Sequence, residues 1–114
     1  MGAQSAARAV AAHGLRFPED FGAMWRAQGG RCYLCEEPLV YALTVADHDH
    51  SCCGAGWSCR VCRRGLACHR CNRIIGQLRD DPELLLRIAV NLENALVVTQ
   101  ARIAAKPARQ SLTG

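Results

Sequence analysis

The stretch "CHRCNRIIGQL", residues 68–78, places a Cys-x-x-Cys pair directly before a segment that we expect to be helical. A second such pair occurs upstream in "CYLC", residues 32–35. Two intervening residues let both thiolates reach one ion, and two such pairs complete the tetrahedral site that zinc prefers. The sequence therefore predicts one structural zinc site with four ligands, Cys32, Cys35, Cys68 and Cys71.

The composition explains why a metal would be needed. Half of the 114 residues are hydrophobic, but only six are aromatic, and residues 31–80 are short of large side chains to bury. Zinc binding contributes roughly 10 to 16 kcal/mol in small zinc domains, which is comparable to the whole stability of a domain. We expect the fold to fail without the ion. Buried cysteines without a ligand, or redox pairs, are the alternative.

The cysteines also suggest a reducing compartment. All eight lie between Cys32 and Cys71, and the N-terminal "MGAQSAARAVAAHG" lacks the charged start and apolar run of a secretory signal. We therefore expect a cytoplasmic protein without membrane association, in which closely spaced cysteines bind zinc rather than form disulfides. The arginine-rich, lysine-poor composition suggests a bacterial cell or a cell infected by phage.

The four inner cysteines allow two interpretations. Cys59-x-x-Cys62 is again a chelating pair, whereas the adjacent Cys52 and Cys53 are expected to point in different directions. One interpretation is a second zinc ion held by Cys53, Cys59 and Cys62, with His50 or another group as the fourth ligand. The other is a redox-labile loop, or an exchange of ligands between the two cysteine sets.

Turn residues and hydrophobic spacing predict the elements around these cysteines. A helix is expected within residues 17–30, because a proline stands in its first turn and two glycines end it. The β-branched, alternating pattern of residues 39–47 predicts a strand, and residues 63–67 are expected to return as the second strand of a hairpin. Between the two strands, residues 51–59 are expected to form a glycine-rich loop.

A long helix is predicted from Pro82, with Asp80 or Asp81 as its N-cap. Its apolar residues occupy two faces, which is more than a single packed stripe requires. They are Leu85, Ile88, Leu92, Leu96 and Ile103 on one face, and Leu86, Val90 and Val97 on another. One face can pack on the domain. The second can pack on another copy in a homodimer, or beneath the N-terminal helix.

The candidate active-site residues lie between the two outer cysteine pairs, Cys32–Cys35 and Cys68–Cys71, and directly after the second pair. In "VADHDHSCC", residues 45–53, Asp47 and His48 stand side by side, and Asn72 follows the last zinc ligand at the start of a helix. A carboxylate offers a hard oxygen ligand, while an imidazole can take a proton near neutral pH. This combination indicates metal-assisted chemistry rather than an ordinary surface turn.

The order of these motifs resembles the recombination endonuclease VII family of HNH nucleases. Cys-x-x-Cys is followed by Asp-His-x-His, Arg-Gly-Leu, Cys-x-x-Cys-Asn and an Asp-x-Pro helix start, over residues 28–92. The resemblance implies a small α+β zinc-stapled domain over residues 16–106, with a ββα-metal (His-Me finger) core between an N-terminal helix and a long C-terminal helix. Residues 1–15 are expected to be flexible, and residues 107–114 to be a disordered tail.

The same resemblance implies a metal-dependent DNA endonuclease that hydrolyses phosphodiester bonds, with branched or junction DNA among the substrates to consider. It implies that Asp47 and Asn72 hold a catalytic Mg²⁺ or Mn²⁺ ion. It further implies that His48 is the general base and that His50 contacts the scissile phosphate. Oxygen ligands suit Mg²⁺, which keeps several waters, so two protein ligands are sufficient. If His50 instead binds a second zinc ion, the phosphate contact is lost.

The charge pattern favours nucleic acid as the partner. The net charge is +4, and the segment from Arg60 to Arg79 holds six arginines and no acid. We expect this segment to contact phosphates, through Arg60, Arg63, Arg64, Arg70 and Arg73. Two other functions are a non-catalytic zinc-stapled module that binds nucleic acid and a zinc domain that binds protein. The intact set of Asp47, His48 and Asn72 favours the nuclease.

Overall fold

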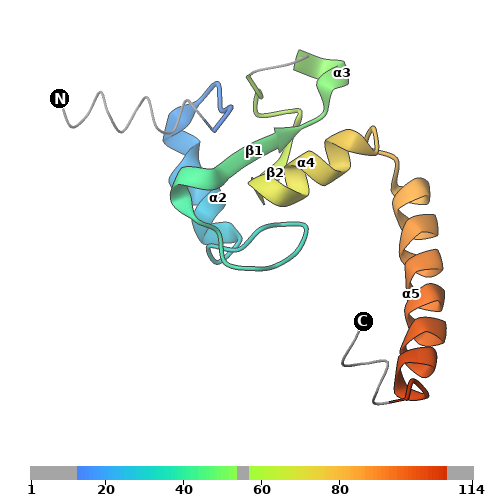
Figure 1. Cartoon of the computed structure of the whole chain (residues 1–114). Helices are drawn as coiled ribbons and strands as arrows, with labels where there is room; N and C mark the ends of the chain where they lie inside the picture. Colours follow the sequence, from blue (N-terminus) through green and yellow to red (C-terminus); the bar gives the residue numbers. More distant parts are fainter. Residues whose placement is uncertain (1–12, 54–56, 108–114) are drawn as a thin grey trace. The chain divides into compact units, whose positions relative to one another are not determined.

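An antiparallel hairpin is the centre of the first of two units in the chain, residues 1–77 and residues 78–114. The computed structural model describes residues 13–53 and 57–107, and Figure 1 labels its helices and strands. The first unit contains η1 (Pro18–Asp20), α2 (Phe21–Ala27), η2 (Tyr41–Leu43), β1 (Thr44–His48), α3 (His50–Cys53), β2 (Arg63–Cys68) and α4 (His69–Gln77). The second contains α5 (Pro82–Ala104). This small set of helices with a two-stranded sheet confirms the predicted α+β class.

The two strands of the hairpin pair from end to end. Thr44 stands opposite Cys68 at one end, and His48 stands opposite Arg63 at the other. The register shifts just before His48, because β2 has one extra residue there, Arg64. A bulge of this kind re-aims the side chains beside it. Helix α4 begins directly after β2 and contacts both strands (Figure 1).

The hydrophobic core of the first unit is small. Its buried residues are Leu15, Phe21, Cys32, Leu39, Ala46, Leu66 and Ala67, with Met24, Trp25 and Tyr33 among those packed against them. Hydrogen bonds join the end of α2 to β2. The Gln28 side chain donates to the backbone oxygen of Leu66 at 2.9 Å and accepts from its backbone amide at 2.8 Å. Polar contacts thus supplement a core that has little apolar area.

The predicted helix within residues 17–30 is confirmed, although its first turn is the 3-10 turn η1. The predicted strand over residues 39–47 is wrong in its first half, because β1 starts only at Thr44. The Thr44 hydroxyl and the Leu43 amide both donate to the Val40 carbonyl, at 2.7 and 3.0 Å. These bonds close a turn, which overrides the extended conformation that the alternating pattern favours.

The loop predicted over residues 51–59 begins as a helix instead. The Asp49 carboxylate accepts hydrogen bonds from the Ser51 amide at 2.9 Å and from the Ser51 hydroxyl at 2.6 Å, which caps the start of α3. Residues 54–56 lie outside the described residues. The returning strand and the helix after the second outer cysteine pair are confirmed as β2 and α4.

The fold begins earlier in the chain than the sequence indicates. Of the segment 1–15 that was expected to be flexible, only the last three residues are described. Two of these, His13 and Leu15, are buried. The Ser58 amide and hydroxyl both donate to the Gly14 carbonyl, at 2.6 and 2.8 Å. The residues just before η1 are therefore part of the first unit.

In the second unit, the start of α5 is as predicted. Asp81 is the N-cap, because its carboxylate accepts hydrogen bonds from the amides of Glu83 and Leu84, at 3.0 and 3.2 Å. No residue of α5 is buried, and the described part of its own unit holds no second helix or strand. The single domain predicted over residues 16–106 would include both units, and it stays a prediction. Of the predicted tail, only its first residue, Pro107, is described.

Helix α5 also has the length and composition of a membrane-spanning helix. It is the one such helix among the described residues, with 23 residues and a mean hydropathy of 1.2 over an 18-residue window. This is weak evidence for a membrane. Glu93 stands near the middle of the helix, where a span would place its carboxylate at the bilayer centre, at a cost of about 2.5 to 3.5 kcal/mol on insertion scales.

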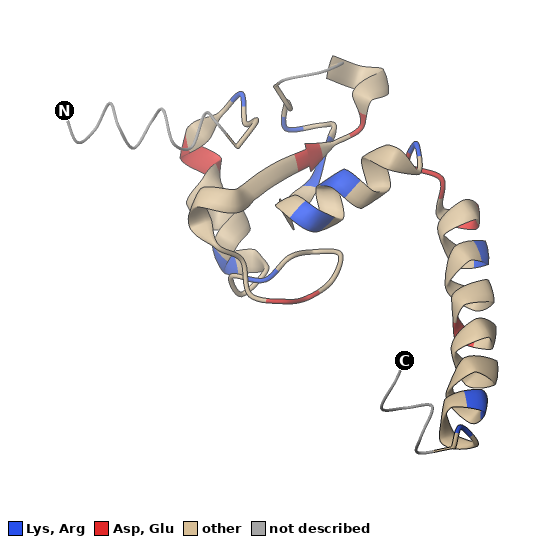
Figure 2. Cartoon of the chain, in the orientation of Figure 1, with Lys and Arg blue, Asp and Glu red and all other residues tan. Residues whose placement is uncertain are grey.

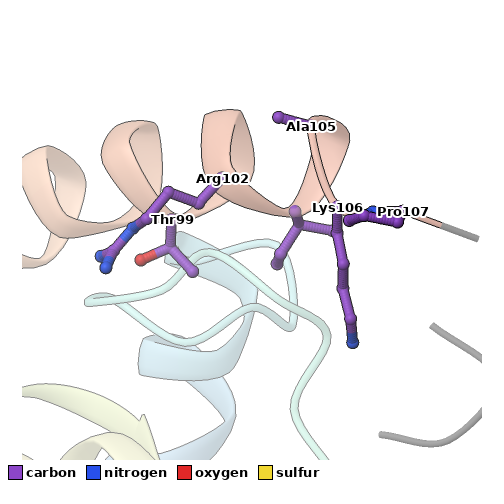
Figure 3. A pocket seen from close by; sticks show the side chains of 6 residues that line it. Thr99, Arg102, Ala105, Lys106 and Pro107 are labelled. Carbon is purple, nitrogen blue, oxygen red and sulfur yellow. The ribbon is translucent and has the colours of Figure 1, made fainter. Parts of the chain in front are cut away.

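A hollow of about 540 Å³ lies at the C-terminal end of α5 (Figure 3). One helix end and the turn after it form the hollow, and the residues that line it are Thr99, Arg102, Ile103, Ala105, Lys106 and Pro107. Two of these are basic, but none of the predicted site residues lines it. The hollow therefore has no part in the candidate site.

An added methyl group at Gly65 tests how closely the hairpin packs on the turn between Cys32 and Cys35. A Cβ there would meet the Tyr33 ring at 2.8 Å, whereas a Cβ at Gly76 on α4 would meet nothing within 4 Å. We expect Gly65→Ala to lower the free energy of unfolding by about 1 to 3 kcal/mol through overpacking. The control Gly76→Ala should keep it or raise it by up to about 1 kcal/mol. Urea unfolding at constant zinc concentration measures the difference, and equal stabilities would contradict the packing.

Candidate functional site

The two outer cysteine pairs meet at one end of the hairpin. Cys32 and Cys35 come from the turn after α2, Cys68 ends β2, and Cys71 lies in the first turn of α4. Their Sγ atoms all lie within 4.8 Å of one another, with 3.9 Å between those of Cys35 and Cys68. Zinc–sulfur bonds of about 2.3 Å in a tetrahedron require sulfur–sulfur distances of about 3.8 Å. The predicted set can therefore hold one metal ion.

Backbone amides surround the sulfur of Cys32. The amides of Leu34 and Cys68 donate to it, at 3.4 and 3.3 Å. Burial raises the pKa of this thiol, but hydrogen bonds from the backbone of Cys35, Cys68 and Leu34 outweigh burial and bring the pKa down to about 7. Since zinc binds the thiolate, the turn favours the form of Cys32 that is a ligand.

The four inner cysteines form a second cluster beyond the other end of the hairpin. The Sγ atoms of Cys52, Cys53, Cys59 and Cys62 all lie within 4.8 Å of one another. The expectation that Cys52 and Cys53 point in different directions is wrong, because both lie on α3. Adjacent residues are about 100° apart around a helix but about 180° apart on a strand, so their sulfurs can converge. This set can also hold an ion, without a ligand from His50.

The candidate catalytic residues border one pocket, of about 220 Å³. Asp47 and His48 reach it from the end of β1, and Asn72 reaches it from the first turn of α4. Asp47 and His48 are only 5% and 6% exposed, and Asn72 is partly buried. The exposed His50 lies next to this group, with its ring centroid 4.5 Å from that of His48. The structure thus brings together the three residues that the sequence predicted to act as one site.

Three hydrogen-bond donors hold the Asp47 carboxylate. Arg64 donates from Nε to Oδ2 at 2.8 Å and from a terminal nitrogen to Oδ1 at 3.0 Å. The Tyr33 hydroxyl donates to Oδ2. Burial, together with this bond to Asp47, raises the pKa of Tyr33, so its hydroxyl stays protonated. Because Tyr33 lies between Cys32 and Cys35, the turn that supplies two sulfurs also positions the carboxylate.

His13 also lines the pocket, although no sequence motif marks it as a site residue. Its ring stacks on Phe21, with 4.8 Å between the centroids, and its Nδ1 pairs with the Thr44 carbonyl oxygen. Since a carbonyl oxygen only accepts, Nδ1 carries the proton and Nε2 is left as an acceptor. Nε2 is buried and has no hydrogen-bond partner among the described residues.

Comparison with known proteins connects these features to a family. The recombination endonuclease VII family profile matches residues 8–94, a range that includes all eight cysteines and the pocket. The chain belongs to the recombination endonuclease VII family. It is also similar to the Gene 59 protein of Mycobacterium phage D29, with 35% identity over 82 residues. That match covers 70% of this chain and 44% of the phage protein, and no solved structure matches the chain.

In this member of the endonuclease VII family, most of the predicted phosphate-contacting arginines are paired with acids. Figure 2 shows basic positions on β2 and α4, and an acidic position at the end of β1. The segment around the arginines has no acid in the sequence, but the fold brings acids from elsewhere to it. The salt bridges are Arg60 to Glu19 and Asp20, Arg63 to Asp20, Arg64 to Asp47, and Arg70 to Glu37.

Two of these arginines share one carboxylate. Hydrogen bonds from Arg60 and Arg63 hold the pKa of Asp20 at about 2, well below its usual value. Arg73 differs, because its terminal nitrogen lies 2.9 Å from Nε2 of His69 and no carboxylate among the described residues forms a salt bridge with it. Of the five predicted arginines, Arg73 is thus the one whose charge is not offset by a neighbouring acid.

Sequence reasoning missed three residues at these sites. Tyr33 and His13 carry no motif, and their contacts with Asp47 and with the pocket depend on how distant segments pack. Cys52 did carry a signal, because it is the fourth cysteine of an inner set of four. That count could have indicated a complete set of sulfur ligands.

Chelation tests the dependence of the first unit on metal. A core this small is expected to be too weak alone, and the roughly 10 to 16 kcal/mol of zinc binding would be lost with the ion. We expect a strong chelator to abolish the cooperative thermal unfolding of the hairpin and α2, and added zinc to restore it. Amide hydrogen exchange of β1 and β2 measures this loss. Unchanged protection in metal-free protein would show that the core suffices.

Proposed function

We propose that this chain is a metal-dependent DNA endonuclease that hydrolyses phosphodiester bonds. The observation that carries the proposal is the single pocket bordered by Asp47, His48 and Asn72. Membership of the endonuclease VII family supports nuclease chemistry and DNA as the partner. Since the chain spans less than half of the Gene 59 protein, the proposal is drawn from the pocket and the family, and not from that relative.

We infer that β1, β2 and α4 form a ββα-metal (His-Me finger) core of the HNH type. An antiparallel hairpin followed directly by a helix that contacts both strands supports this inference. The end of β1 supplies Asp47 and His48, and the first turn of α4 supplies Asn72. The strand and the helix thus contribute to the same pocket, as metal-assisted hydrolysis between them requires.

The donors of the pocket fit a divalent cation such as Mg²⁺ or Mn²⁺. Asp47 and Asn72 offer a carboxylate and an amide oxygen, which are the hard ligands that Mg²⁺ takes. A carboxylate has about four acceptor positions, and Tyr33 and Arg64 use three of those on Asp47. One position is left for the ion, which would stabilise negative charge on the scissile phosphate and on the departing 3′ oxygen.

His48 is the proposed general base. Its imidazole is buried but borders the pocket, so it can take a proton from a water molecule held there. His50, which is exposed beside it, is the proposed contact to the scissile phosphate. The inner cysteines supply four sulfurs of their own, so His50 is not needed as a zinc ligand.

The arginines of β2, of the turn before it and of α4 are the proposed contacts to the DNA backbone. Such contacts depend on salt and are mostly blind to sequence. Arg73 can bind a phosphate directly. Arg60, Arg63 and Arg70 would have to exchange a carboxylate of this chain for a phosphate. We therefore assign the largest single electrostatic contribution to Arg73.

We further propose that α5 joins two copies of the chain in a homodimer. The helix carries apolar residues on two faces, and neither face is covered within the described part of its own unit, residues 78–107. Burial of one face against a second copy would remove exposed leucine and valine side chains from water. A dimer would also hold two pockets apart, which cleavage of both strands of a branched DNA requires.

The alternative is a zinc-stapled module that binds nucleic acid without cutting it. One observation favours it, because Arg64 contacts both oxygens of the proposed metal ligand Asp47. Arg64 would then be a structural partner of the carboxylate, and no cation would bind there. The two functions differ in a plasmid-nicking assay.

Nicking of supercoiled plasmid in Mg²⁺ or Mn²⁺ tests the proposed base. We expect the wild type to nick and His48→Ala to lose about 100-fold or more of the rate. Its zinc content and DNA affinity should not change, because only the base is removed. Asp47→Ala and Asn72→Ala should also abolish nicking, through loss of the divalent ion. Gln77→Ala, at an exposed position of α4 away from the pocket residues, is the control and should nick normally.

If wild type and variants bind DNA equally and none of them cuts with any divalent ion, the binding module is the function instead. A variant that loses its zinc as well as its activity does not test the catalytic role of the substituted residue, because its fold is also changed. Zinc content is therefore measured on every sample that enters the assay.

Two arginine variants test the electrostatic assignment. We expect Arg73→Ala to weaken DNA binding at low salt and to reduce the slope of log K against log salt concentration by about 1. Arg60→Ala should change the slope less, because Glu19 and Asp20 already offset its charge. Filter binding or fluorescence anisotropy over a salt series measures both slopes. Equal slopes for the two variants would contradict the assignment.

A further inference from the structure

We propose that Cys52, Cys53, Cys59 and Cys62 bind a second zinc ion, which fixes the loop between β1 and β2 beside the pocket. The proposal goes beyond the proposed function, because it does not depend on DNA cleavage. It rests on the geometry of the four sulfurs and on their chemistry.

The spacing of the sulfurs matches a tetrahedral zinc site. The Sγ distances are 3.9 Å for Cys52 and Cys53, 3.7 Å for Cys52 and Cys59, and 3.6 Å for Cys59 and Cys62. All are close to the edge of about 3.8 Å that four zinc–sulfur bonds imply. A disulfide would hold two sulfurs at about 2.05 Å, and all four cysteines are free thiols. The cluster therefore has the size of a metal site rather than of a disulfide pair.

The chemistry of the ligand set favours zinc over the hard cations. Four sulfurs without a carboxylate are soft ligands, which select zinc against Mg²⁺.

The second cluster is separate from the first. Cys68, of the first cluster, pairs with Thr44 at one end of the hairpin, whereas Cys62 directly precedes Arg63, which pairs with His48 at the other end. The six steps of chain from Cys62 to Cys68, at about 3.3 Å each along a strand, place these two residues about 20 Å apart. Exchange of ligands between the two cysteine sets is therefore excluded within this fold, and each set needs its own ion.

The Cys59–Cys62 side of the loop is anchored in the first unit, because the Ser58 amide and hydroxyl donate to the Gly14 carbonyl and Arg60 pairs with Asp20. Trp57 and Val61 are 49% and 89% exposed, so the described residues of the loop bury little apolar area. The Asp49 amide donates to the Cys62 carbonyl at 2.9 Å and closes the base of the loop. An ion bound to α3 and to the Cys59–Cys62 turn would fix α3. Because α3 begins with His50, the ion would also hold His50 beside His48.

The zinc-to-protein ratio of the purified full chain, measured by elemental analysis, tests the proposal. We expect two zinc ions in the wild type and one in the double variant Cys59→Ser, Cys62→Ser. Val61→Ser is the matched control, because Val61 lies in the same turn with an exposed side chain, and it should keep two ions. His50→Ala should also keep two. X-ray absorption of the wild type should show only sulfur ligands, at about 2.3 Å.

Hydrogen exchange gives a readout for the loop itself. The Asp49 amide should exchange faster in the double variant, whereas the amides of β1 near the first cluster should keep their protection. If the double variant does not fold, the metal ratio and the absorption spectrum of the wild type still decide. These readouts involve no DNA, so they remain valid if the chain proves unable to cut.

Three results would overturn the proposal. One is a single zinc ion per wild-type chain. Another is a nitrogen ligand in the absorption spectrum together with loss of an ion in His50→Ala. The third is a disulfide within the inner set, detected by mass spectrometry of protein that was purified under reducing conditions and alkylated.

Discussion

The meeting of four cysteine sulfurs at the Thr44–Cys68 end of the hairpin is the constraint on which the first unit depends. Among the described residues, the apolar core has only seven buried members, two of them alanine and one of them a cysteine of this cluster. Burial of a large apolar side chain contributes about 1.5 to 3 kcal/mol, whereas each ordered residue costs about 1 to 2 kcal/mol of backbone entropy. A core of this size needs a further link between the turn, β2 and α4, and a metal bound to the sulfurs would supply it.

The same turn connects structure to the pocket. Tyr33 lies between two of the sulfurs and donates to Asp47, and Asn72 directly follows a third. A shift of the cysteine turn or of the first turn of α4 would therefore move a group of the pocket. The bulge at Arg64 adds to this arrangement, because it lets a residue of β2 reach the carboxylate of β1. A buried carboxylate needs such partners, since burial without them is costly.

Charge in the first unit is organised by tertiary contacts rather than by sequence neighbours. The arginines are concentrated in one segment, but their acidic partners come from η1, from the loop after the first cysteine turn, and from β1. Much of the apparent basic surface is thereby neutralised within the chain. The basic surface that is not offset by acids of the chain is therefore smaller than the composition suggests. Arg73 on α4 is its clearest part.

By itself, the sequence determined the features that depend on neighbouring residues: the chelating Cys-x-x-Cys turns, the hairpin that returns at Arg63, the cap of α5 at Asp81, and the adjacent Asp47 and His48. Short-range spacing is sufficient for these, because each involves residues within one turn or one strand. Only the tertiary structure decided that Cys52 joins Cys53 in one cluster, that Tyr33 and Arg64 hold Asp47, and that His13 reaches the pocket. These contacts depend on the register of the hairpin, on a bulge and on a short capped helix, which bring distant side chains within a few ångströms of one another. The periodicity of the sequence does not encode these three features.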